Sequence, residues 1–179
     1  MTILSDKEGS LVMQISAEED WRLFTHLLAD ARGQKPDWLA KRFGVLMDDE
    51  DWDELIAPEL SARFQKEIEE VEEMVKAAYE DYQKQLAAEE KGLLKEEVES
   101  AEEELPFGEI SFNRETSSAW YSVLNQARLF LEGRWKLAAL EEAEEITAED
   151  VDPDRMGAYI RSRFYTRLQA LLLDFTLEL

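Results

Sequence analysis

Hydrophobic residues recur along most of this chain at steps of three and four, the spacing that is typical of an amphipathic α-helix. The first such stripe spans residues 21–31, and Ser16 with Glu19 before it has the spacing of a capping box. Gly33 ends the pattern. We therefore predict a helix that starts at Ser16 and ends at Gly33, followed by a short helix over 37–43.

The longest stripe begins near Pro58 and has the spacing of a heptad repeat. Its apolar positions are Phe64, Ile68, Val71, Val75, Ala78 and Tyr82. Glu occupies most of the positions between them, so we predict one long acidic helix. Residues 48–59 are expected to form an acidic loop, and residues 89–106 an acidic connection. The expected anchors of the loop are Trp52, Leu55 and Ile56.

Two short apolar runs, at 11–15 and 110–112, are rich in strand-forming residues, and they could pair. Asn113 follows the second run and is a residue type that caps helices. Two further helices are predicted, over 114–140 and 153–178. The stripe of the first consists of Trp120, Val123, Leu124, Ala127, Leu131 and Ala138, and that of the second of Ile160, Phe164, Leu168, Leu171, Leu172 and Phe175.

A chain of 179 residues with 45% apolar content can bury a sizeable core within one domain. We therefore expect a single all-α domain over residues 1–179. The helices should form an antiparallel bundle with one long acidic member, to which the two short runs can add one two-stranded β element.

The formal net charge is −22, and residues 48–105 hold 22 Asp and Glu against six Lys and Arg. Binding to nucleic acid rests on clusters of cations, so we expect neither nucleic acid nor an anionic membrane surface as a partner. No apolar stretch is long enough to span a membrane, and the first ten residues do not resemble a signal peptide. We therefore expect a cytoplasmic protein.

Catalytic and metal-binding motifs are missing from the sequence. The chain has no Cys and one His, His26, which leaves no thiolate zinc site, no histidine pair for a di-metal bundle and no nucleophile–base pair. Two Asp-rich segments, 49–53 and 150–154, lack the Gly and the Glu that a calcium loop requires. We predict no cofactor, no metal and no enzymatic activity.

The candidate binding residues form a mainly basic set at the margins of the apolar stripes of the last two helices. They are Asn125, Arg128, Arg134, Arg161, Arg163 and Arg167. One interpretation is that the arginines pair with glutamates of the helix over 58–90, because an unpaired buried charge is costly. The other is a groove that accepts an acidic segment or a C-terminal carboxylate, which Arg can bind through two hydrogen bonds.

The second half of the chain carries the pattern Trp120-x-x-x-Leu124-Asn125-x-x-Arg128-Leu129-x-Leu131-x-x-Arg134. A later helix then carries Tyr165, Leu168, Gln169 and Leu172. This pattern resembles an uncharacterised bacterial family, a domain of unknown function whose members are acidic and helical. Genes of that family often lie beside the gene for the adaptor of the Clp protease. The resemblance implies a link to protein turnover and no particular activity.

The leading hypothesis from the sequence is a non-catalytic module that binds or regulates a protein partner, with a link to protein turnover. One alternative is a small-ligand binder or enzyme with a pocket between the helices over 114–140 and 153–178. Another is a structural homodimer joined through the last helix. The sequence leaves monomer and homodimer both open.

Overall fold

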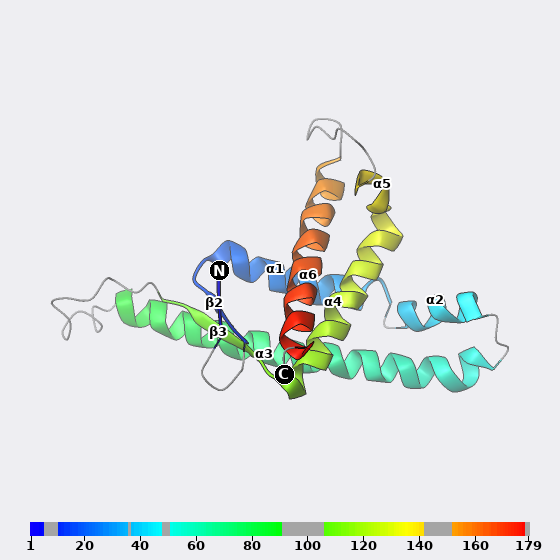
Figure 1. Ribbon diagram of the computed structural model, residues 1–179, viewed down its shortest axis with the longest axis horizontal. Helices are drawn as coiled ribbons and strands as arrows, with labels where there is room; N and C mark the ends of the chain where they lie inside the picture. Colours follow the sequence, from blue (N-terminus) through cyan, green and yellow to red (C-terminus); the bar gives the residue numbers. More distant parts are fainter. Residues whose placement is uncertain (6–10, 36, 48–50, 91–105, 142–151, 178–179) are drawn as a thin grey trace.

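The chain folds into a mainly helical structure with one small antiparallel sheet, and the expectation of an all-α fold is confirmed (Figure 1). The computed structural model describes residues 1–5, 11–35, 37–47, 51–90, 106–141 and 152–177. Most of the acidic connection predicted over 89–106 lies outside the described residues. Among the described helices, none is both long and apolar enough to cross a membrane. The helices are α1 (Glu18–Arg32), α2 (Trp38–Met47), α3 (Ala57–Glu90), α4 (Arg114–Trp135), α5 (Ala138–Glu141) and α6 (Pro153–Leu177), and a π-helical turn, η1 (Trp52–Ile56), precedes α3.

The sheet has three strands in the order β1 (Thr2–Ser5), β2 (Leu11–Ile15) and β3 (Gly108–Phe112). The predicted pairing of the second and third is confirmed, with Met13 opposite Ile110. The sequence led us to expect two strands, and the sheet has one more, because β1 adds an edge strand. The side chains of Thr2, Ile3 and Leu4 in β1 are exposed, so no buried face marks this strand in the sequence, and its pairing with β2 alone defines it.

Local capping signals have different outcomes at the two ends of the sheet. The capping box predicted at Ser16 is wrong, because α1 begins at Glu18 after an Ala17 N-cap that makes no side-chain hydrogen bond. Ser16 continues from β2, and its carbonyl oxygen accepts a hydrogen bond from the Tyr82 hydroxyl at 3.2 Å. At the start of α4 the prediction is confirmed: the Asn113 side chain accepts hydrogen bonds from two amides of the first turn, each at 2.9 Å.

Helices α4 and α6 lie side by side and run antiparallel, as the sequence predicts for them (Figure 1). The long helix α3 does not join them as a parallel member of a bundle; it crosses beneath the pair. The reason is that α3 must cover several elements along its length. It packs against α1, β3 and the beginning of α4 and, at its N-terminal end, against α2 and η1.

The main core is aromatic at its centre, where Trp120 of α4 meets Phe24 of α1 and Phe112 of β3 at ring distances of 6.1 and 5.0 Å. The heptad stripe of α3 is buried from Ile68 to Tyr82, as predicted, while Phe64 at its start is half-buried. The edge-to-face contacts of Trp120 with the two phenylalanine rings stabilise the core beyond what the burial of apolar area alone contributes.

The predicted stripe of α6 is partly wrong. Ile160 is 58% exposed and Leu171 is 38% exposed, whereas Ala158 and Tyr165 are completely buried. The helix is therefore rotated about its axis relative to the face that its aliphatic residues alone would select. On α4, the stripe ends at Leu131, because the helix stops at Trp135 and Ala138 is exposed in α5.

A small second cluster holds α2 and η1 together. The indole of Trp52 is buried against Ala40 and donates a hydrogen bond to its carbonyl oxygen at 2.8 Å. The other predicted anchors, Leu55 and Ile56, are exposed. Helix α2 also continues through Gly44 instead of ending there. A side chain at that position would collide with the Trp52 ring, at 2.4 Å, so this glycine makes room for the indole.

We expect Gly108→Ala to destabilise the fold by about 2 kcal/mol or more, because overpacking a tight contact displaces backbone. A Cβ at Gly108 would lie 2.3 Å from the carbonyl oxygen of Ala78 and 2.6 Å from the Trp21 ring. Urea unfolding measures the change. Gly157→Ala on α6 is the matched control, since its nearest neighbour would lie at 3.7 Å, and it should gain roughly 0.5–1 kcal/mol. Equal effects would contradict the close approach of β3 to α3.

Candidate functional site

The polar centre of the α1–α6 interface is a buried carboxylate. Asp30 lies on the buried face of α1 and is 7% exposed. Arg161 of α6 donates from Nε to Asp30 Oδ2 at 2.9 Å, and its Nη2 lies 3.5 Å from Oδ1. The Tyr165 hydroxyl donates to the same Oδ2 at 3.0 Å. We call this group the Asp30 triad; its members are Asp30, Arg161 and Tyr165.

The Asp30 triad also controls the ionisation of its tyrosine. Burial raises the pKa of Tyr165 far above its usual value of about 10, and the negative charge of Asp30 raises this pKa further. The Arg161 guanidinium lowers the pKa of Tyr165 by less than the other two effects raise it. The hydroxyl therefore stays protonated and remains a hydrogen-bond donor.

A second polar link joins α6 to α4 near the middle of the pair. Gln169 is 3% exposed; its side-chain oxygen accepts from the Arg128 guanidinium, and its amide donates to the carbonyl oxygen of Tyr121 at 3.2 Å. Asn125 lies one turn of α4 from both Tyr121 and Arg128. It is half-buried and makes no side-chain hydrogen bond to the described residues. This link closes the middle of the α4–α6 interface.

The first of the two interpretations, that the arginines pair with glutamates of the helix over 58–90, is wrong for two of them. Arg161 pairs with Asp30 of α1, and Arg128 with Gln169 of α6. The reason is the crossing of α3, which brings a carboxylate to the first half of α4. There the buried Glu67 accepts hydrogen bonds from Ser122 and from Arg63 of its own helix.

The remaining arginines of the set lie in two separate places. Arg163 and Arg167 are exposed on the outer side of α6. Arg134 is exposed near the C-terminal end of α4, and its Cζ lies 5.2 Å from the centre of the Trp135 ring. The structure therefore does not assemble the predicted basic set into one groove.

Two members of the set, Arg134 and Arg161, do meet around a cavity of about 240 Å³. It lies between the C-terminal end of α4 and the N-terminal end of α6, with α1 behind, and we call it the end cavity. Its lining residues are Asp30, Phe130, Arg134, Trp135, Pro153, Asp154, Gly157 and Arg161. Asn125 and Arg128, the other candidate binding residues on α4, do not line it.

Arg155 supports the end cavity, and sequence reasoning missed it. Its Nε donates to the carbonyl oxygen of Trp135 at 2.9 Å, and its Nη2 to that of Lys136 at 2.9 Å. These are carbonyl oxygens at the end of α4 that have no partner within the helix. Arg155 thus ties the first turn of α6 to the last turn of α4. The signal in the sequence is a cation two residues after Pro153.

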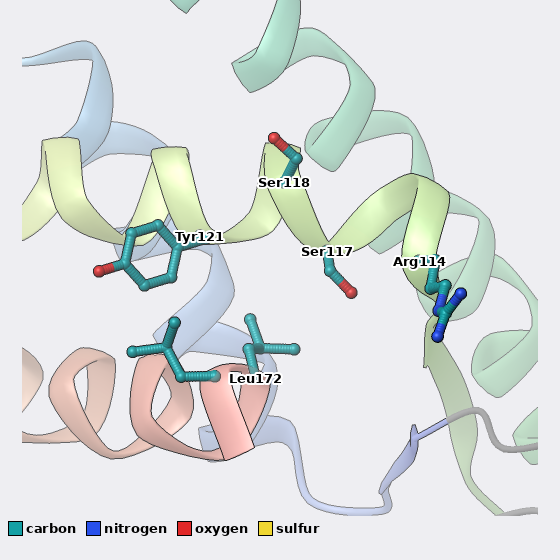
Figure 2. Close-up of a pocket in the computed structure, with 6 residues that line it drawn as sticks. Arg114, Ser117, Ser118, Tyr121 and Leu172 are labelled. Carbon is teal, nitrogen blue, oxygen red and sulfur yellow. The ribbon is translucent and has the colours of Figure 1, made fainter. Parts of the chain in front are cut away.

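A second cavity, of about 260 Å³, lies at the opposite end of the α4–α6 pair (Figure 2). It is lined by Arg114, Ser117, Ser118, Tyr121, Leu172 and Leu173. The Ser117 hydroxyl donates to the carbonyl oxygen of Asn113, so the most buried polar group of the wall is satisfied inside the protein. None of the predicted site residues lines this cavity.

Within the described ranges, no group of three or more His, Asp or Glu side chains is placed to hold a metal ion. No protein-family model, curated protein or solved structure matches the chain. The resemblance of the Trp120–Arg134 block therefore stays a prediction, as does the function that it implies.

Replacement of Asp30 by Ala should destabilise the protein by about 3 kcal/mol, because it leaves the largely buried Arg161 without its counter-charge and the Tyr165 hydroxyl without an acceptor. Urea unfolding at neutral pH measures this. Asp37→Ala is the matched control, because its ion pair with Lys41 is exposed and should contribute little. Similar small losses in both variants would show that the buried pair stabilises no more than a surface pair.

The raised pKa of Tyr165 predicts a loss of stability at alkaline pH. The unfolded chain releases this proton near pH ~10, while the folded protein retains it, so the contribution of Tyr165 is complete below about pH 10 and is lost as the pH rises further. Above that pH, wild type should lose roughly 1.4 kcal/mol per pH unit more than Tyr165→Phe does. Urea unfolding at increasing pH tests this. Tyr121→Phe, at an exposed position, should behave as wild type; no difference for Tyr165→Phe would refute the prediction.

Proposed function

We propose that the protein is a non-catalytic module that binds a protein partner through the outer side of α6. The surface in question, the outer stripe, consists of Ile160, Arg163, Arg167 and Leu171. These residues follow each other at steps of three, four and four, so they lie on one side of the helix. All four are exposed, including the two large apolar side chains.

The single observation that carries the proposal is the combination of cations and exposed apolar side chains on this stripe, in a chain whose net charge is −22. Most Asp and Glu lie elsewhere; residues 57–90 alone hold ten of them against four Lys and Arg. A partner that presents acidic side chains around an apolar patch complements the outer stripe. The opposite charge would steer the encounter, and the apolar contacts would hold the complex.

The contrast with the inner arginines supports this assignment. Arg128 and Arg161 are half-buried and hydrogen-bonded to Gln169 and Asp30, so they orient α6 from its inner side. Arg163 and Arg167 are on the opposite side of the helix and face solvent. The resemblance of the Trp120–Arg134 block to a family encoded beside the Clp adaptor extends the proposal to protein turnover.

The experiment is affinity capture from native lysate with mass spectrometry, comparing wild type with Arg163→Glu/Arg167→Glu. The amount of a specific partner captured by the variant should be lower by about tenfold or more, because each charge reversal replaces an attraction by a repulsion. Lys66→Glu/Lys76→Glu is the matched control. It makes the same change of charge on exposed positions of α3 and should keep the partner.

Unchanged circular dichroism and melting temperature must accompany the loss, so that unfolding does not explain it. Capture of the same proteins by all three baits would overturn the proposal. A dimer in light scattering that only the α6 variant disrupts would identify a second copy of the chain as the occupant, and would favour the homodimer alternative.

A further inference from the structure

The end cavity is lined by a glycine in the first turns of α6, Gly157. A Cβ at Gly157 would have one neighbour within 4 Å, Nη1 of Arg161 at 3.7 Å. Glycine within a helix costs roughly 0.5–1 kcal/mol relative to alanine, and neither a close approach nor a positive φ requires it here. What its missing side chain provides is space beside a guanidinium group.

Hydrogen-bond donors are left over on that guanidinium. Arg161 directs Nε and Nη2 toward Asp30, while Nη1 lies toward Gly157 and makes no hydrogen bond to a described residue. Arg134 stacks on Trp135 and has no ion pair with the residues that the structure describes. Two guanidinium groups therefore line one cavity with unused donors, which a carboxylate can accept.

The two carboxylates of the cavity balance the two guanidinium groups in charge, but they do not occupy all of the guanidinium hydrogen-bond donors. Asp30 is already satisfied by Arg161 and Tyr165. Asp154 is exposed at the start of α6, where the helix dipole compensates part of its charge. The amides of this first turn are not the source of attraction, since the Asp152 side chain accepts hydrogen bonds from two of them.

The other walls of the cavity are apolar and aromatic, formed by Phe130, Trp135 and Pro153. Its volume of about 240 Å³ is below the roughly 300–1,000 Å³ of sites for drug-sized ligands. The space suits one carboxylate and one ring or aliphatic side chain. A small aromatic acid has this chemistry, and so does the last residue of a peptide chain.

We propose that the end cavity binds a carboxylate that is carried beside an aromatic or apolar group, with Arg134 and Arg161 as the anion-binding residues. The outer stripe lies on the other side of α6, so this site and the proposed partner surface can succeed or fail separately.

The probes are N-acetyl-L-phenylalanine and a hexapeptide ending in phenylalanine, each compared with its C-terminal amide by isothermal titration calorimetry. Both free acids should bind, and each amide should bind about tenfold more weakly or not at all, because it lacks the charge that the arginines recognise. Equal affinity of the two acids would identify a free small acid as sufficient; binding of the hexapeptide alone would identify a chain terminus as the ligand.

Two variants locate the site. Gly157→Leu fills the cavity without changing charge and should abolish binding, while Gly157→Ala should bind as wild type or slightly more weakly. Arg134→Gln should weaken binding by about tenfold, whereas Arg22→Gln, an exposed arginine on α1 away from the cavity, should not. Thermal melting shows that each variant is folded.

The proposal is overturned if no acid binds at millimolar concentration, or if the amides bind as well as the acids. Binding that survives both Gly157→Leu and Arg134→Gln would also overturn it, because the acids would then occupy another surface.

Discussion

Asp30 brings a negative charge into the interface between α1 and α6, and a carboxylate in such a place is stable only when charged and polar groups surround it. Arg161 and Tyr165 are those groups, and both come from α6. They set the rotation of α6 about its axis, since turning the helix by a third of a turn would leave Asp30 unpaired. The outward direction of Ile160 and of Arg163 follows from the same constraint.

The same interaction relates the two surfaces that we propose. Arg161 binds Asp30 through Nε and Nη2, and its Nη1 lies at the end cavity. The structural ion pair therefore also orients a candidate binding group. The outer stripe faces solvent because the inner side of α6 packs against α1 and α4. A buried pair of this kind often contributes more to a unique arrangement than to the free energy of unfolding, and here the arrangement separates an inner arginine from the outer pair.

Part of the candidate site is predictable from sequence, and part is not. Arg134 and Arg161 stand out because they lie at the margins of apolar stripes, where a cation needs a partner. Asp30 also gives a local signal, since it lies between Leu27 and Ala31 on the buried face of α1. That it meets Arg161 cannot be deduced locally, because 131 residues separate the two.

Local patterns suffice for what is decided within one or two turns of chain: the heptad stripe of α3, the Asn113 cap and the end of α1 at Gly33. Hydrogen bonds and periodicities of this kind involve neighbours in sequence, so the sequence alone reveals them. The pairing of β1 with β2, the crossing of α3, the rotation of α6 and the end cavity depend on which faces meet. These features depend on contacts between segments that are distant in sequence. The burial and the charge pairing of such segments become defined only when the tertiary structure brings them together.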